Sequence, residues 1–288
     1  TLRRDHLGTY GYERETTPDL DKWAAQSTVF EDARTVAPWT LPSTRSLWTG
    51  RQPEWWSESN TLQETLGGRG WATGTYVGNV YLSSNFEMDR GWGEHHCVNW
   101  PGANYEVRHA REFLARHADQ DALLMVHFMD LHLPYKEPVK YRRLWAKTDP
   151  PGLEPYFNRT ILMREAGRAR EMLRPYLIDR YDQNLRYVND ELAPFLGEMP
   201  KDATVVLFAD HGEEFFDHGD LEHGHTLYDE LLRVPLVIRS PNLPVGRVDG
   251  PVSLLDVAPT LVELLELPAD PLPNAAGRSL VGAAKGLD

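Results

Sequence analysis

Asp210 and His211 stand side by side in the sequence, and both side chains are able to bind a metal ion. Residues 203–208 before them read Ala-Thr-Val-Val-Leu-Phe, an apolar and β-branched run that predicts a buried strand. In open α/β sheets, ligands bind beyond the carboxyl ends of the strands, where both side chains would lie. A carboxylate beside an imidazole suits a divalent ion such as zinc or manganese. The alternative is a simple turn in which the histidine is hydrogen-bonded.

Thr40 is the second candidate for a role in catalysis. It opens a segment, 40–47, that predicts a helix, since a proline at position 42 is tolerated in the first turn. The N-terminus of a helix favours a bound anion. A hydroxyl is a poor nucleophile at neutral pH, but coordination to a metal lowers its pKa and supplies the alkoxide. On local sequence alone, an ordinary N-cap threonine is the simpler interpretation.

Several motifs, taken together, resemble the sulfatase family of the alkaline phosphatase superfamily. The nucleophile motif of that family is Cys or Ser-x-Pro-Ser-Arg with a later Thr-Gly, and residues 40–50 align with it on Pro42-Ser43 and Thr49-Gly50. The opening residues 1–12, the Asp-x-His-x-Pro-Tyr segment at 130–135 and landmarks at 231–236 and 256–260 also match the family in order and spacing. The resemblance covers the chain from Thr1 to about Leu280.

The resemblance implies a fold and a set of roles. The fold would be α/β, with a mostly parallel central sheet flanked by helices on both faces, as in alkaline phosphatase. Thr40 would be the nucleophile, and Asp210, His211 and Thr40 would hold one divalent ion (zinc, manganese or calcium), with a second ion as a further option. Asp130 would bind that second ion or orient His132, which corresponds to a histidine that contacts the transferred group. The alternative for Asp130 is a turn-capping carboxylate.

A further histidine is implied twelve residues beyond His211, where the family places a Lys or His that contacts the substrate. His223 stands at that offset and would bind a second metal, contact the non-bridging oxygens or protonate the leaving group. His225 and His218 are the alternatives. Arg3 follows the expected position of a metal ligand, but a structural ion pair is the favoured interpretation.

The chain departs from the family at the residues that would bind the transferred group. Thr40 cannot be converted into the formylglycine of sulfatases. The supporting arginine of the motif is replaced by Thr44, with Arg45 one place on. The Gly-Lys-x-His-x-Gly segment has become 78–83, so that Asn79 and Tyr81 stand where the family has two cations. We therefore expect Arg45, Asn79, Tyr81 and His225 in substrate binding.

These departures resemble the Thr-dependent phosphodiesterases, phosphatases and phosphoryl-group transferases of the superfamily. We expect a metal-dependent hydrolase that prefers phosphate over sulfate esters and acts through a covalent Thr40 intermediate. Its substrate would be a small-molecule, glycan or lipid anionic ester. A phosphoethanolamine-type transferase and a non-catalytic, sulfatase-like binding domain are the alternatives.

Composition narrows the class of partner. A net charge of −13 argues against nucleic acid as a main partner. Handling anionic esters in so acidic a protein requires locally focused positive charge, which a metal provides. No apolar run approaches the ~20 residues of a membrane span. Cys97 is the single cysteine, so no internal disulfide forms and the redox compartment is undetermined.

The 288 residues are expected to form one catalytic domain. Periodicity predicts helices at 17–25, 40–47, 62–66, 105–117, 173–196 and 255–266, and strands at 28–30, 72–77, 122–128, 203–208 and 234–238. This βα alternation predicts a mostly parallel sheet. The resemblance further implies a strand before Thr1 that ends in a metal-ligating Asp, and a C-terminal subdomain, so we expect both to lie outside this sequence. A periplasmic, extracellular or membrane-attached parent protein is compatible with it.

Overall fold

The computed structural model describes residues 1–150, 153, 159–267 and 271–287, without the side chains of 164–169. The helices are α1 (Pro18–Ala24), α2 (Thr40–Thr49), α3 (Leu62–Gly67), α4 (Ala103–Arg116), α5 (Arg159–Glu198), α6 (Asp229–Leu232), α7 (Val257–Leu264) and α8 (Val281–Ala284). The strands are β1 (Thr28–Arg34), β2 (Ala72–Val77), β3 (Glu94–Cys97), β4 (Ala122–His127), β5 (Val205–Phe208), β6 (Glu214–Phe215), β7 (Leu221–Glu222), β8 (Arg233–Arg239) and β9 (Gly246–Ser253).

Strand pairing divides the main strands into two sheets. One has the order β5-β8-β1-β9 and the other the order β3-β2-β4. The second sheet is parallel throughout, and in the first only β8 runs against its neighbours. The predicted mostly parallel α/β architecture is therefore confirmed. The described strands nevertheless do not join into one sheet, because β4 pairs only with β2 and β5 only with β8.

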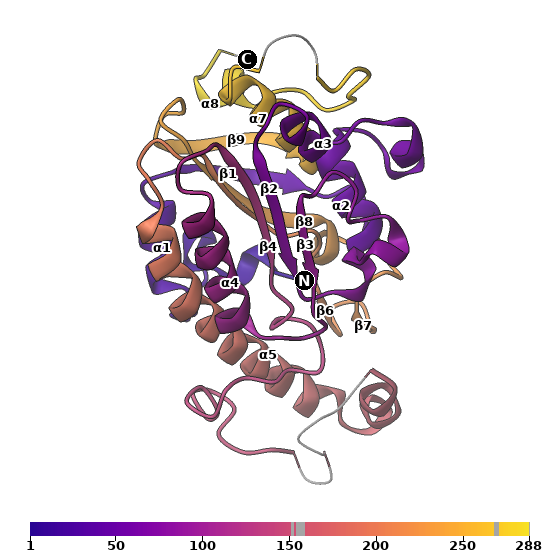
Figure 1. Ribbon diagram of the computed structural model, residues 1–288. Coiled ribbons are helices and arrows are strands. Elements are labelled where there is room, and N and C mark those ends of the chain that lie inside the picture. The colour runs from indigo at the N-terminus through magenta and orange to yellow at the C-terminus, as the bar shows by residue number, and fades with distance from the viewer. Residues whose placement is uncertain (151–152, 154–158, 268–270, 288) are drawn as a thin grey trace.

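Helices cover both faces of the strands, and the alternation of side chains along each strand explains how. Val29 of β1 and Val237 of β8 pack with Leu20 and Trp23 of α1 on one face. Phe30, next in sequence to Val29, packs in a cluster with residues of α2 and α7 on the other face. Figure 1 shows α1, α4 and α5 lying together on one side of the strands. Because successive side chains of a strand point to opposite faces, each face of the strands packs against its own layer of helices.

The predicted elements are present, with differences that have physical causes. The long helix α5 begins at Arg159 and not at 173, and it continues through Pro175 and Pro194, which in the sequence signal breaks. Strand β9 was not predicted, because Gly246, Gly250 and Pro251 disfavour a strand. Its burial pattern is mostly exposed, as an edge strand allows. None of the described helices is both long and apolar enough to span a membrane.

Candidate active site

Thr40 is the first residue of α2, and its side chain is buried. Trp39 before it has extended backbone angles and takes the N-cap position. The Thr40 hydroxyl lies 3.2 Å from His211 Nε2 and accepts a hydrogen bond from Asn79 Nδ2 at 3.2 Å. The hydroxyl therefore faces the predicted metal-binding pair from the positive end of a helix dipole.

Asp210 and His211 follow β5, and both are buried. Ser43 of α2 donates a hydrogen bond to the Asp210 carbonyl at 2.6 Å, which ties the helix start to the strand end. The chain then passes close to another segment at Gly212, where a Cβ atom would lie 1.8 Å from the Glu230 carbonyl. Only glycine fits this approach. Two elements far apart in sequence are thus fixed against each other at the site.

The hydrogen bonds of His211 assign its tautomer. Its Nδ1 lies 2.8 Å from the Gly212 carbonyl, which can only accept, so Nδ1 carries the proton. Burial holds the pKa of His211 well below its ordinary value, so the ring is neutral. Its Nε2 lone pair is left facing Thr40 Oγ1, with Asp210 Oδ2 at 3.5 Å. An imidazole in this state is a metal ligand or a proton acceptor.

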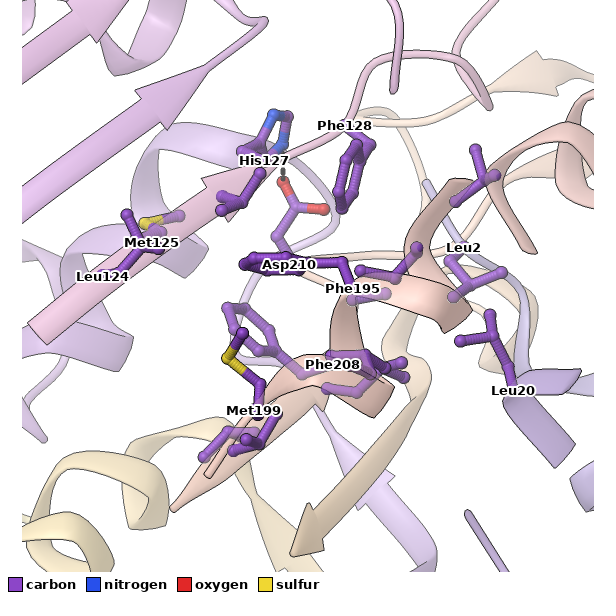
Figure 2. Close-up of a pocket in the computed structure, with 18 of the residues that line it drawn as sticks. Leu2, Leu20, Leu124, Met125, His127, Phe128, Phe195, Met199, Phe208 and Asp210 are labelled. Atoms are coloured by element: carbon purple, nitrogen blue, oxygen red, sulfur yellow. Dashed lines mark ion pairs between the residues drawn. The ribbon is translucent and has the colours of Figure 1, made fainter. Parts of the chain in front are cut away.

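Asp210 lies among cationic and imidazole groups. Its Oδ1 is 3.2 Å from the Thr1 ammonium, and its Oδ2 is 3.8 Å from His127 Nε2 (Figure 2). Burial opposes ionisation, but His211, the ammonium and His127 outweigh it and hold the pKa of Asp210 well below its ordinary range. Oδ2 is buried and has no hydrogen-bond donor. The carboxylate is therefore ionised, with one oxygen available to a cation.

This donor set fits a divalent ion. Asp210 Oδ2, His211 Nε2 and Thr40 Oγ1 converge, and three protein ligands are typical of a catalytic metal site. Within the described part of the chain, no group of three or more His, Cys, Asp or Glu residues is arranged to hold a metal. A set of three donors here would therefore need the hydroxyl of Thr40.

Two more histidines extend the site away from His211. The His223 ring lies 4.1 Å from the His211 ring and 4.9 Å from the His132 ring, measured between centroids. Burial lowers the pKa of both His223 and His132 to about 4. His223 Nδ1 lies 2.9 Å from Glu213 Oε1, and burial raises the pKa of Glu213 to about 7. The result is a row of neutral imidazoles beside the Thr40 hydroxyl.

The alternative histidines lie elsewhere. His225 is directed to Glu214 Oε2 at 3.4 Å and Asp220 Oδ2 at 3.5 Å. His218 contacts Glu230 Oε1 at 3.3 Å. The structure therefore brings His223, and neither of the other two, against the His211 ring.

Of the other residues predicted to bind substrate, Asn79 and Tyr81 lie at the site, whereas Arg45 is engaged elsewhere. Asn79 touches Thr40 directly, and its Oδ1 accepts a hydrogen bond from the Tyr81 amide at 2.9 Å. The Tyr81 side chain is exposed and packs edge-on against Trp39, next to the site. Arg45 instead donates to the Phe86 carbonyl at 3.0 Å, so it is engaged with the neighbouring turn.

Two more residues lie near the site: His127, which the sequence did not single out, and Arg3, which was expected to form a structural ion pair. His127 ends β4 and approaches Asp210, but a lone histidine at the end of an apolar run belongs to no motif. Arg3 donates to the Glu213 carbonyl at 3.2 Å and forms ion pairs with Asp5 and Asp217. This is the structural ion pair expected for Arg3, and it also supports the segment that carries Glu213.

Asp130 has the geometry of a capping carboxylate, which was the alternative to a metal ligand. Its Oδ1 accepts a hydrogen bond from the Ala103 amide, at the start of α4, at 3.3 Å. Burial raises the pKa of Asp130 to about 6. Burial, with a smaller contribution from the Asp130 charge, also raises the pKa of Glu106 to about 8. Glu106 is buried, and its Oε1 lacks a hydrogen-bond partner.

Glu106→Gln is expected to stabilise the protein at pH 8 and to have much less effect at pH 5. Because the folded-state pKa of Glu106 lies above its unfolded value, its stability contribution is fully present below about pH 4.5 and is lost as pH rises towards about 8. Because glutamine does not titrate, the increase in the free energy of unfolding that the substitution causes should be larger at pH 8 than at pH 5 by roughly 2–4 kcal/mol. Urea unfolding at both pH values measures it. Equal effects of the substitution at both pH values would refute the raised pKa.

Comparison with known proteins identifies the family. A profile described as sulfatase matches residues 1–267. The uncharacterized sulfatase YidJ of Escherichia coli is 23% identical over 93% of this chain, which spans 66% of YidJ. Phosphoethanolamine transferase EptC of E. coli is 25% identical over 75% of this chain, which spans 39% of EptC.

Solved structures share the fold. Phosphonate monoester hydrolase of Agrobacterium radiobacter superposes with a TM-score of 0.75 at 17% identity, covering 100% of this chain and 76% of that one. The C-terminal periplasmic domain of EptC, in complex with Zn, superposes with a TM-score of 0.72 at 19% identity, covering 91% of this chain and 79% of that one. Since the family profile extends over residues 1–267, the chain belongs to the sulfatase family of the alkaline phosphatase superfamily.

Proposed function

We propose that this protein is a metal-dependent phosphoester hydrolase that uses Thr40 as its nucleophile. One observation carries the proposal: the buried Thr40 hydroxyl lies at the start of α2, 3.2 Å from His211 Nε2 and hydrogen-bonded to Asn79. A structural N-cap threonine would instead face the amides of its own helix. The family supports hydrolase or transferase chemistry on an anionic ester.

The chain's own residues define the steps. A divalent ion held by Asp210, His211 and Thr40 would lower the pKa of the hydroxyl. Thr40 Oγ then forms a bond to phosphorus as the bond from phosphorus to the leaving oxygen breaks. The proton that Thr40 loses would pass to solvent, and one proton would reach the leaving oxygen through His223, which takes it up in turn from solvent. Water next attacks phosphorus, which releases phosphate and restores the hydroxyl.

The residues around the transferred group support phosphate over sulfate. Thr40 cannot become formylglycine, which the resemblance gives as the nucleophile of sulfatases. Asn79 contacts Thr40 as a neutral donor, where the resemblance implies a lysine. The neutral His132 and His223 leave a bound metal as the main positive charge. A small-molecule, glycan or lipid phosphoester therefore suits the site.

A transferase is the second candidate, and the similarity to phosphoethanolamine transferase EptC favours it. The first step would be unchanged, with an acceptor hydroxyl in place of water in the second. Product analysis in the presence of an alcohol separates the two. A hydrolase gives free phosphate, whereas a transferase gives the phosphorylated alcohol.

Phosphoester turnover is expected to exceed sulfate-ester turnover by at least ~10-fold in kcat/KM, equivalent to about 1.4 kcal/mol in transition-state binding. The substrates are an aryl phosphomonoester, an aryl phosphodiester and the matching aryl sulfate, all with one leaving group. The enzyme is the protein as its gene encodes it. Faster turnover of the sulfate ester would show that neutral Asn79 and Tyr81, in place of two cations, do not favour phosphate.

A further inference from the structure

The row of imidazoles beside Thr40 continues beyond His132 into an aromatic ring and a cation. The indole of Trp100 lies nearly perpendicular to the His132 ring, with 5.3 Å between centroids. Lys136 Nζ lies over the indole, 5.4 Å from its centroid. Steps of 4.9, 5.3 and 5.4 Å therefore lead from the His223 ring through His132 and Trp100 to the ammonium.

The backbone of Trp100 also ties this residue to the site. Its amide donates a hydrogen bond to the Gly78 carbonyl at 3.1 Å, one residue before Asn79. A Cβ atom at Gly78 would lie 2.9 Å from Met129 Cγ and 3.3 Å from Pro101 Cδ. The loop that follows β3 and the segment that follows β4 therefore pack closely at Gly78. This packing holds the two chain segments of the extended row against each other.

Trp100 has an unfavourable backbone conformation. Its φ of 55° lies in the left-handed region, which bulky side chains rarely adopt. The side chain is only partly buried, so complete burial of the indole is not the reason for this conformation. Residues held in such conformations cluster at active sites and ligand-binding sites. The conformation instead presents the indole beside His132.

Lys136 is an exposed cation without a carboxylate partner. Among the residues that the structure describes, it forms no ion pair. Residues 136–147 carry five cationic residues and one acid, Glu137, in a protein whose net charge is −13. Glu137 is buried, and its Oε1 lies 2.7 Å from Arg180 Nε, so it does not offset the positive charge at the surface. This segment therefore presents a positive potential at the far end of the row.

The place of Trp100 and Lys136 relative to the reaction associates them with the leaving group. In the proposed mechanism, phosphorus lies beside Thr40 and the leaving oxygen lies on the side of His223. A leaving group on that oxygen would extend past His132 towards the indole. A small alcohol would end before Lys136, whereas a longer one would bring its far end to the ammonium.

We propose that Trp100 and Lys136 form a recognition subsite for a leaving group that carries its own anion, either a carboxylate or a phosphate. The proposal rests on the proposed function, because the direction of the leaving group follows from the role of His223. The exposed part of the indole would contact the apolar part of the leaving group, and the ammonium would pair with its anion. The substrate would thus be a phosphoester with a second negative charge at its far end.

Two matched aryl phosphates test the subsite. One bears a carboxylate on an alkyl arm of the aryl ring and the other bears the corresponding carboxamide, so that their sizes match and their charges differ. The measured quantity is the ratio of their kcat/KM values, because the intrinsic reactivity of each ester cancels when this ratio is compared between proteins. We expect Lys136→Gln to lower the ratio by about 5-fold, the upper range for an exposed ion pair, and Lys136→Glu to lower it further.

A second arm of the experiment distinguishes the two possible anions. It replaces the carboxylate of the alkyl arm with a phosphate, and the ratio is again taken to the carboxamide ester. Both ratios should fall as salt is added, because salt screens an exposed pair. The anion whose ratio depends more strongly on Lys136 is the one that the subsite prefers.

Lys140→Gln is the matched control for the cation. Lys140 Nζ also lies over an aromatic ring, 4.8 Å from the Tyr141 centroid, but it is 3.5 Å from Asp190 Oδ2. Its substitution should leave the ratio unchanged. Trp100→Asn removes the indole and keeps a residue that tolerates the left-handed conformation, so it should raise KM for both esters by about 5-fold.

The opposite results are equally specific. The same ratio in the native protein and in Lys136→Gln would overturn the proposal, as would an equal fall in Lys140→Gln. Turnover of no aryl phosphate at all would count against the proposed function instead. Calorimetry with the non-cleavable aryl phosphonates that bear the same carboxylate or carboxamide would then decide the role of Lys136. Tighter binding of the carboxylate that Lys136→Gln abolishes would support the subsite, and equal binding of the two phosphonates would overturn it.

Discussion

Thr40→Ala is expected to abolish phosphoester turnover, with a loss of several orders of magnitude approaching the ~10⁶-fold cost of deleting a nucleophile. The substitution removes the attacking oxygen and one of the three converging metal donors together. Thr40→Ser keeps the hydroxyl and loses only the methyl group that restricts χ1, so it should retain measurable activity. Initial rates of the variants and of the native protein measure both effects.

Thr49→Ala is the matched control for the nucleophile. Thr49 is also a buried threonine of α2, but its hydroxyl donates to the Arg45 carbonyl at the other end of the helix. This variant should lose about 1 kcal/mol of stability at constant kcat. An active Thr40→Ala protein that is only slightly destabilised would reduce Thr40 to a structural residue and eliminate the covalent mechanism.

Asp210→Asn is expected to weaken divalent metal binding by at least ~100-fold and to lower activity with it. The substitution keeps the shape of the side chain but removes the charge from an oxygen that has no hydrogen-bond donor. Calorimetric titration with Zn²⁺ and Mn²⁺ measures the affinity. Chelation of the native protein should reproduce the loss, and added metal should restore activity.

Asp130→Asn separates the two carboxylates proposed as ligands. An asparagine at this position can still accept the hydrogen bond from the Ala103 amide. The variant should therefore bind the first metal ion with unchanged affinity. Loss of that metal in Asp130→Asn, with retention in Asp210→Asn, would show that the ligands have been assigned to the wrong carboxylate.

The sequence predicted the elements that carry the candidate site better than the contacts between them. Asp210 and His211 were recognisable because they follow a strand that the local pattern predicts, whereas Thr40 was singled out by the resemblance of residues 40–50 to the family motif. Their juxtaposition depends on contacts such as the Ser43–Asp210 hydrogen bond, which span more than 160 residues and leave no local pattern. For the same reason, the offset from His211 favoured His223 but left His225 and His218 as alternatives, and the packing of His223 against the His211 ring distinguishes it from them.

Strand burial shows the same limit. The apolar run at 203–208 predicted a buried strand, and β5 forms there, but each of its four residues is only partly buried. Local composition specifies what a strand is suited to contact, whereas the neighbour that covers it comes from elsewhere in the chain. Asp130 shows that local sequence also leaves the role of a polar residue open. A carboxylate after a strand suits either a metal or a helix N-terminus, and only the fold brings Asp130 against the Ala103 amide.

The central claim is that Thr40 forms a covalent bond to phosphorus, and acid-quench mass spectrometry tests it most directly. The protein is loaded with metal, mixed with excess aryl phosphomonoester and quenched in acid within the first turnovers. It is then digested and sequenced by fragmentation. We expect one added phosphoryl group on the peptide that contains residues 39–50, located at Thr40 and absent from Thr40→Ala. Rapid turnover with Thr40 unmodified at every quench time, and inversion of configuration at a chiral phosphorus, would contradict the account.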